Sequence, residues 1–204
     1  MNLDDEKRIS DIYNGRLKEG LSDHKSVGWG SKESQYLRFK ILTEIDELSK
    51  NNVLDVGCGL GELFNFFTKN SIKINSYKGI DISKDLILEA QKRFDKEKKA
   101  TFEFTNIDKL QGHESYDYIF LSGALNLKVE NNLLYAKRVI KKMFSQCKKG
   151  VACNFLSSYS DFSLEKDYHY SPEELFSYSK GLSTRVVLRH DYPLYEFTLY
   201  IYKD

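Results

Sequence analysis

The chain has 204 residues, of which 41% are hydrophobic and 30% charged, and its formal net charge is +1. This composition is typical of a globular domain with a substantial core, and the balanced charge argues against nucleic acid or an anionic membrane as a partner. No apolar run approaches transmembrane length, and the N-terminus is too polar for a signal peptide. The three cysteines lack metal-ligand spacing. We expect the protein to be cytoplasmic, to bind no metal and to be a monomer or a homodimer.

The first thirty residues are expected to form an N-terminal extension. Within 1–21, residues at helical spacing predict an amphipathic helix: Ile9, Ile12, Tyr13 and Leu17. This helix either packs on the edge of the domain or covers the substrate. The loop that follows contains the only tryptophan, Trp29, which is either a core residue or a wall of the substrate pocket.

A second helix is expected after this loop. Ser31 is a suitable N-cap, and the apolar residues that follow at helical spacing are Leu37, Ile41, Ile45 and Leu48. Gln35 and Arg38 are three residues apart and therefore share a face of this helix. Arg38 is either a surface charge or a cation that binds a ligand.

The chain then carries its most informative stretch, Val53-Leu54-Asp55-Val56-Gly57-Cys58-Gly59-Leu60-Gly61-Glu62. Its beginning predicts a buried strand, and the pattern after Glu62 predicts a helix. The glycines between them permit positive φ and the close approach of a ligand, and the helix N-terminus adds unpaired N–H groups. Asp55 would repel a pyrophosphate, and it would either attract a cationic amine or accept hydrogen bonds from ribose hydroxyls. The Gly-x-Gly-x-Gly spacing also departs from the dinucleotide-binding pattern.

The second strand is expected over 76–82. It contains Asp81 near its end, where a carboxylate is placed to accept hydrogen bonds from both hydroxyls of a ribose. Ser83 is a suitable N-cap for a helix over 84–96. This acid, correctly placed after the glycine turn, strengthens the prediction of a nucleoside-containing cofactor.

The third and fourth strands are expected over 101–105 and 116–121. In an open α/β sheet, ligands bind at the carboxyl ends of the strands. The residues that follow these two strands are Asn106, Ile107, Ser122 and Gly123.

A long helix is expected over 131–147. We expect its apolar residues to pack against the sheet and its basic residues to lie outside: the apolar residues are Leu134, Val139, Ile140, Met143 and Phe144, and the basic residues are Lys137, Arg138, Lys141 and Lys142. Because the total charge is balanced, a solvated face explains the basic residues better than a phosphate-binding surface. We expect Gly150 to cap this helix before a fifth strand over 151–156.

The remaining chain predicts a loop, a helix and two strands. Residues 157–171 are rich in polar and aromatic side chains, which suits a substrate pocket. A helix is expected from Pro172, with Ser171 as its N-cap. Strands over 183–189 and 195–203 are predicted to pair in antiparallel fashion.

Together these motifs resemble the Rossmann-like (class I) S-adenosylmethionine (SAM)-dependent methyltransferases, whose first motif reads like V-L-D-V-G-C-G-x-G. The resemblance implies an α/β fold, a Rossmann-like three-layer sandwich with a seven-stranded mixed sheet closed by a C-terminal antiparallel hairpin. It also implies a single SAM-dependent methyltransferase domain over 1–204, with 1–30 as an N-terminal lid or extension and 31–204 as the Rossmann-like core.

The resemblance further implies a binding site for SAM. Its cofactor-binding residues would be Asp55, Gly57, Cys58, Gly59, Gly61, Asp81, Ile82, Asn106, Ile107, Ser122, Gly123, Arg38 and Gln35. In this family an acid usually stands where Asn106 is found, so Asn106 would accept a bond from the adenine amino group through its side-chain oxygen. Asp108 is the alternative acceptor. Arg38 would pair with the SAM carboxylate.

Residues for the methyl acceptor are less specific. The substrate-binding candidates are Tyr13, Trp29, Asn126, Tyr159 and Tyr168. A hydroxyl acceptor would need a base, and the catalytic candidates are His169 and His24, each of which also fits a surface or packing role.

We therefore expect a methyltransferase that transfers a methyl group from SAM to an O or N atom of a small-molecule acceptor. The chain lacks the N-P-P-Y-type sequence of amino-methylating DNA enzymes. It also lacks, after the fourth strand, the Pro-Cys pair of a cysteine-based C5 mechanism. Both classes of enzyme are therefore disfavoured. A tRNA or rRNA methyltransferase and a non-catalytic SAM-binding regulatory module are the alternatives.

Overall fold

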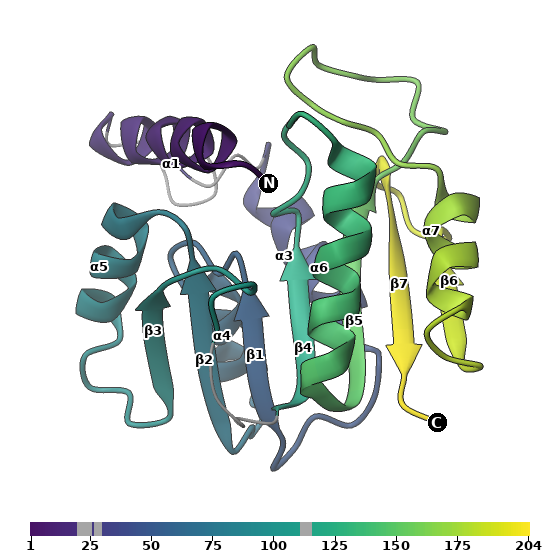
Figure 1. Ribbon diagram of the computed structural model, residues 1–204. Helices are drawn as coiled ribbons and strands as arrows, with labels where there is room; N and C mark the ends of the chain where they lie inside the picture. Colours follow the sequence, from purple (N-terminus) through teal and green to yellow (C-terminus); the bar gives the residue numbers. More distant parts are fainter. Residues whose placement is uncertain (20–25, 27–29, 111–115) are drawn as a thin grey trace.

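The computed structural model describes residues 1–19, 26, 30–110 and 116–204. A seven-stranded sheet forms its centre (Figure 1), made of β1 (Asn52–Val56), β2 (Ser76–Asp81), β3 (Ala100–Phe104), β4 (Tyr116–Ser122), β5 (Cys147–Leu156), β6 (Val186–Arg189) and β7 (Glu196–Tyr202). Around it lie α1 (Leu3–Lys18), α3 (Lys32–Thr43), α4 (Glu62–Lys69), α5 (Lys84–Arg93), α6 (Asn132–Gln146) and α7 (Pro172–Lys180).

The strand order is β3-β2-β1-β4-β5-β7-β6. β7 runs antiparallel to β5 and β6, whereas the other neighbouring pairs are parallel. The predicted mixed sheet with a C-terminal antiparallel pair is confirmed. This pair ends the sheet at one edge and leaves it open. β1 and β4 are neighbours at the point where the chain changes its direction across the sheet.

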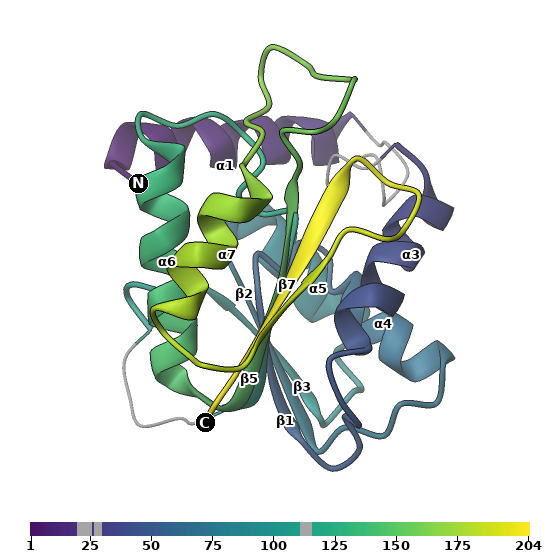
Figure 2. The ribbon, with the colours of Figure 1, turned by 90° about the vertical axis from the view of Figure 1, so that its right-hand side faces the viewer.

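Helices cover both faces of the sheet, which confirms the three-layer sandwich. α3, α4 and α5 pack on one face, and α6 and α7 pack on the other (Figure 2). Each face has its own apolar core. One contains Phe67 of α4 and Phe120 of β4, and the other contains Met143 of α6 and Phe197 of β7. Among the described helices, none has the length and apolar character needed to cross a lipid bilayer.

The three predicted N-caps are confirmed. The side chains of Ser31, Ser83 and Ser171 each accept a hydrogen bond from the backbone N–H three residues later. Because a capped first turn satisfies one of the orphan donors of a helix, these serines set where α3, α5 and α7 begin.

Two expectations about α6 are wrong. Leu134 is 65% exposed, because it lies on the opposite side of the helix from the buried Ala136. Gly150 does not cap the helix, since β5 follows α6 directly at Cys147. Gly150 lies within β5, where an added Cβ would be only 3.1 Å from the Cδ1 of Ile45. Close packing of Ile45, from the segment after α3, therefore explains this glycine.

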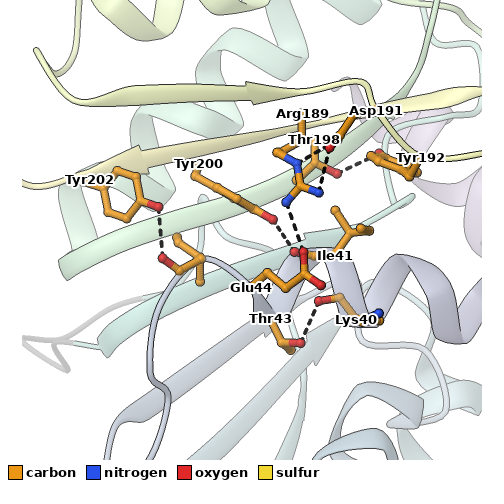
Figure 3. A network of polar contacts seen from close by, with 11 residues as sticks. Lys40, Ile41, Thr43, Glu44, Arg189, Asp191, Tyr192, Thr198, Tyr200 and Tyr202 are labelled. Atoms are coloured by element: carbon orange, nitrogen blue, oxygen red, sulfur yellow. Dashed lines mark hydrogen bonds and ion pairs between the residues drawn. The ribbon is translucent and has the colours of Figure 1, made fainter.

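Tyrosine hydroxyls fasten α3 to β7 (Figure 3). Tyr200 donates a hydrogen bond to the carbonyl of Ile41 in the last turn of α3, and Tyr202 donates to the carbonyl of Ile45 at 2.9 Å. The carbonyl of Ile41 also accepts from the amide of Glu44, so the Tyr200 hydroxyl uses its second lone pair, whereas Tyr202 bonds to a carbonyl just beyond the end of α3. The two tyrosine bonds fix the position of α3 over β7.

Replacing Tyr202 by Phe removes the donor to Ile45. We expect the free energy of unfolding to fall by about 0.5–1.5 kcal/mol, measured by urea denaturation. Tyr195→Phe is the matched control, because the Tyr195 ring is 54% exposed and its hydroxyl forms no hydrogen bond to the described residues. An equal loss in the two variants would contradict a bond-specific effect.

Candidate functional site

A cavity of about 560 Å³ lies at the carboxyl edge of the parallel strands. This volume is typical of small-molecule sites. Its wall comes from the residues that follow β1, β2, β3 and β4, from α1 and α3, and from residues 162–169 and 194–196. The cavity therefore borders the point between β1 and β4 where open α/β sheets bind ligands.

Most of the sequence-predicted site residues line this cavity. They are Asp55, Gly57, Cys58, Gly59, Asp81, Ile82, Asn106, Ile107, Ser122, Gly123, Arg38, Gln35, Tyr13, Asn126 and His169. His24 and Trp29 lie outside the described residues. Among the residues that the structure describes, no group of three or more His, Cys, Asp or Glu side chains is arranged to hold a metal ion.

The turn between β1 and α4 forms one side of the cavity. Gly57 and Gly59 have φ of 75° and 53°, a region that favours glycine. Gly57 also has no room for a side chain, since a Cβ would lie 2.3 Å from the Cβ of Ala124. α4 begins after Gly61 without a side-chain cap. The turn thus presents bare backbone and an uncapped helix N-terminus to a ligand.

Gly61 does not line the cavity. Its φ is 79°, and an added Cβ would lie 2.7 Å from the Phe94 ring and 2.9 Å from the Phe102 ring. The predicted contact of Gly61 with a cofactor is therefore not supported. Gly61 allows the two rings to pack against the turn and so fixes its shape.

Asp55 has a buried carboxyl group in the cavity wall. The Tyr77 hydroxyl of β2 donates to its Oδ2 at 2.6 Å. Burial raises the pKa of Asp55 to about 7, and the charge of Asp81 also raises it, whereas the Tyr77 bond lowers it. A cation placed beside Asp55 would favour its ionised form.

Asp81 joins the end of β2 to the glycine turn. Its Oδ2 accepts from the amide of Gly59 at 2.9 Å, and its Oδ1 accepts from the amide of Ser83 at 2.8 Å. Burial raises the pKa of Asp81, and bonds from backbone amides oppose that rise. A carboxylate has about four acceptor positions, so these bonds leave capacity for a ligand.

Asn106 holds the turn after β3. Its Oδ1 accepts from the amide of Lys109 at 3.0 Å, and its Nδ2 donates to Glu6 of α1 at 3.2 Å. A bond from an adenine amino group would therefore use the second lone pair of Oδ1. The alternative acceptor, Asp108, does not line the cavity and pairs with Arg138 at 2.9 Å.

α1 lies across the carboxyl edge of the sheet (Figure 1). Tyr13 lines the cavity, and burial raises the pKa of its hydroxyl to about 12. Asn14 accepts from the Ser83 hydroxyl at 2.6 Å, and Asp5 accepts from the amide of Glu130 at 3.0 Å. α1 is thus fastened on both sides of the strand-order reversal.

Arg38 and Gln35 of α3 are both buried in the cavity wall. Nε of Arg38 donates to Oε1 of Glu196 at 2.7 Å. Glu196 is fully buried, and this burial raises its pKa while Arg38 lowers it. The alternative that Arg38 is a surface charge is wrong, because its face of α3 packs against β7.

His169 lines the cavity from the segment before α7. Its Nδ1 lies 2.9 Å from the carbonyl oxygen of Ser157. A carbonyl only accepts, so this contact places a hydrogen on Nδ1 and leaves Nε2 as the acceptor of the neutral ring.

Tyr159 and Tyr168, two predicted substrate-binding residues, do not line the cavity. Tyr159 is 68% exposed and donates to Glu173 of α7. Tyr168 packs edge-on against Tyr170, with 4.8 Å between ring centroids, and belongs to the core under α6 and α7. Other residues of the same segment line the cavity instead: Phe162, Leu164, Lys166 and Asp167.

Sequence reasoning missed Tyr77, which bonds to Asp55, and Glu196, which pairs with Arg38. Both lie in strands whose pattern predicts only packing. One signal was present for Glu196: Arg38 lies four residues before the buried Leu42 and therefore on the buried face of α3. A buried arginine requires a nearby acid.

The basic face of α6 is partly neutralised. Lys137 pairs with Glu174 at 2.8 Å, and Arg138 pairs with Asp108 at 2.9 Å. These partners reduce the positive field that a phosphate backbone would require.

Comparison with known proteins identifies the family. A family model described as "Methyltransferase domain" matches residues 47–184, more than half of the chain. The chain belongs to this methyltransferase family. "Putative methyltransferase Rv1506c" from Mycobacterium tuberculosis (strain ATCC 25618 / H37Rv) is 31% identical over 171 residues, which cover 80% of this chain and 98% of that protein.

Solved structures of methyltransferases share the fold. Magnesium protoporphyrin IX methyltransferase (ChlM) from Synechocystis PCC 6803, crystallised with SAM, has a TM-score of 0.67 and 18% identity, covering 100% of this chain and 99% of that chain. N-methyltransferase NodS from Bradyrhizobium japonicum WM9, crystallised with S-adenosyl-L-homocysteine (SAH), has a TM-score of 0.67 and 14% identity, covering 94% of this chain and 98% of that chain. The predicted Rossmann-like class I methyltransferase fold is therefore confirmed.

The raised pKa of Asp55 predicts how stability depends on pH. Between the ordinary aspartate pKa of 3.8 and about 7 the folded state binds more protons than the unfolded state, so stability should fall as pH rises through this range. Asp55→Asn has no carboxyl group to ionise. We expect this variant to melt at a higher temperature than the natural protein at pH 8, with a difference that shrinks towards pH 5, when both are followed by circular dichroism.

Asp95→Asn is the control for this series, because Asp95 is exposed. It should follow the natural protein at every pH. The same melting curve for Asp55→Asn and the natural protein across the range would contradict a buried, ionising Asp55.

Proposed function

We propose that this chain is a SAM-dependent methyltransferase that acts on an O or N atom of a small-molecule acceptor. One observation carries the proposal. Two buried carboxyl groups, Asp55 and Asp81, flank the glycine turn at the reversal point of the sheet, and among the described residues no cation lowers the pKa of either. A ligand with a cationic amine and ribose hydroxyls suits both groups, whereas a pyrophosphate would be repelled. The SAM-bound methyltransferase of the same fold supports this choice.

Each part of SAM has a candidate partner. Asp55 would bind the amino group, Asp81 the ribose hydroxyls, and Asn106 and Ile107 the adenine. Arg38 and Gln35 would hold the carboxylate end, with Nε of Arg38 committed to Glu196 and other guanidinium N–H groups directed to SAM. Ser122 and Gly123 would lie beneath the sulfonium.

When bound, SAM would supply a methyl group activated by its sulfonium. The chain would hold the acceptor in line with that methyl group and exclude water. The position of α1 across the cavity supports our proposal that residues 1–204 act as one domain with 1–30 as an N-terminal lid or extension. For a hydroxyl acceptor, Nε2 of His169 would take the proton.

Asp81→Ala tests the nucleoside site. We expect SAM binding to weaken by about 1–3 kcal/mol in calorimetric titration, the cost of unpaired polar contacts. Asp95→Ala, an exposed acid beyond the end of α5, is the matched control and should bind SAM as the natural protein does. Unchanged affinity of Asp81→Ala would remove Asp81 from the site.

Arg38→Ala tests the carboxylate contact. This variant should bind SAM more weakly while losing less affinity for decarboxylated SAM, because only SAM carries the group that Arg38 would hold. Lys40→Ala, on the exposed face of the same helix, is the control. Equal losses for the two ligands would rule the contact out.

A further inference from the structure

Exposed hydrophobic side chains gather at one end of the cavity. Nine large hydrophobic residues are exposed in the described chain, and four of them lie in the segment 157–169 or just before β7: Tyr159, Phe162, Leu164 and Tyr195. The rings of Phe162 and Tyr195 are 5.9 Å apart between centroids. Figures 1 and 2 show that segment 157–169 extends beyond the carboxyl edge of the sheet.

The hydrophobic patch is continuous with the cavity. Phe162, Leu164 and Tyr195 line the cavity as well as being exposed. Hydrophobic side chains gathered at the rim of a pocket mark a surface that a ligand covers. The occupant suggested by this continuity is a small molecule that reaches from the cavity onto the patch.

A buried acid lies beside this patch. Glu196 is adjacent to Tyr195 in the chain, is fully buried and is part of the cavity wall. Its Oε1 accepts from Arg38, while its Oε2 is buried with no hydrogen-bond partner. A buried acceptor without a donor is destabilising, so a ligand that donates an N–H group here would gain a bond that the protein leaves unmade.

The place of Glu196 in the sheet indicates an anchoring role. β5 lies between β4 and β7. Neighbouring strands are about 4.8 Å apart, so β7 is roughly 10 Å from Ser122, where the sulfonium would lie. Glu196 would therefore bind a part of the acceptor distant from the methylated atom.

We propose that this end of the cavity is an acceptor subsite for an amphipathic amine. Glu196 Oε2 accepts a hydrogen bond from the amine, and Phe162, Leu164 and Tyr195 cover its apolar body. The methylated atom is a different O or N atom of the same acceptor. This inference rests on the proposed methyltransferase function, whose acceptor class it names.

Calorimetric titration of the SAH-loaded full chain with three probes tests the subsite. The probes are 2-phenylethylamine, 3-phenylpropionate, which lacks the N–H donor, and ethylamine, which lacks the ring. We expect 2-phenylethylamine to bind roughly ten-fold more tightly than either of the others, because only it carries both groups. Equal affinity of 2-phenylethylamine and 3-phenylpropionate, or no binding of any probe, would overturn the proposal.

Two variants assign the contacts. Phe162→Ser and Glu196→Gln should each weaken binding of 2-phenylethylamine roughly ten-fold, and Phe162→Ser should leave SAH affinity unchanged. Leu134→Ser, an exposed apolar residue on α6 outside the cavity, should change neither. Loss of SAH affinity in Glu196→Gln with unchanged amine binding would show that Glu196 serves Arg38 and would overturn the proposal.

The two proposals fail separately. If the natural protein does not bind SAH, the methyltransferase function fails, and the same three probes titrated into the free protein decide whether the subsite exists. If Glu196→Gln does not fold, Phe162→Ser and the comparison of the three probes still decide the matter.

Discussion

The hydrogen bond from the Gly59 amide to Asp81 fastens the turn after β1 to the end of β2, and the rest of the site depends on it. It keeps the glycine backbone open towards the cavity and holds Asp81 close to Asp55, each buried. Burial raises the pKa of both carboxyl groups. The free site is thus an unfavourable place for two negative charges, and a cationic ligand would relieve it. Stability that is given up in this way at a binding site is common in enzymes.

The two ends of the cavity are built by different means. At the β1 end, backbone amides and glycines form the wall, so few side chains intervene between the sheet and a ligand. At the β7 end, side chains form it: Arg38 reaches Glu196 because the hydroxyls of Tyr200 and Tyr202 hold α3 against β7. In methyltransferases that share a cofactor and a fold but act on different acceptors, a side-chain wall is the part that changes most easily.

The sequence predicted the fold and the side of the cavity formed by the glycine turn because both depend on local patterns. Strand periodicity, serine caps and the Gly57–Gly61 turn each specify their own geometry within a few residues. The end of the cavity at β7 could not be predicted in the same way. Glu196 meets Arg38 across 158 positions of sequence, and only the tertiary fold brings them together.

The segment 157–169 shows the same limit at the level of single residues. Its aromatic content correctly predicted a wall of the cavity, yet Tyr159 faces α7 and Phe162 lines the cavity. An irregular loop has no period that assigns one side chain to a core and the next to a pocket. For Gly150, close packing in β5 and helix capping require the same residue type, so the sequence could not separate them.

Calorimetric titration of the natural protein with SAM, SAH and NADH tests the central claim most directly, because it asks whether the two acids and the glycine turn select a cationic nucleoside over a pyrophosphate. Our account predicts micromolar binding of SAM and SAH and no binding of NADH. Binding of NADH, or absence of SAM binding, would contradict it and would mean that the glycine turn serves another ligand or the fold alone.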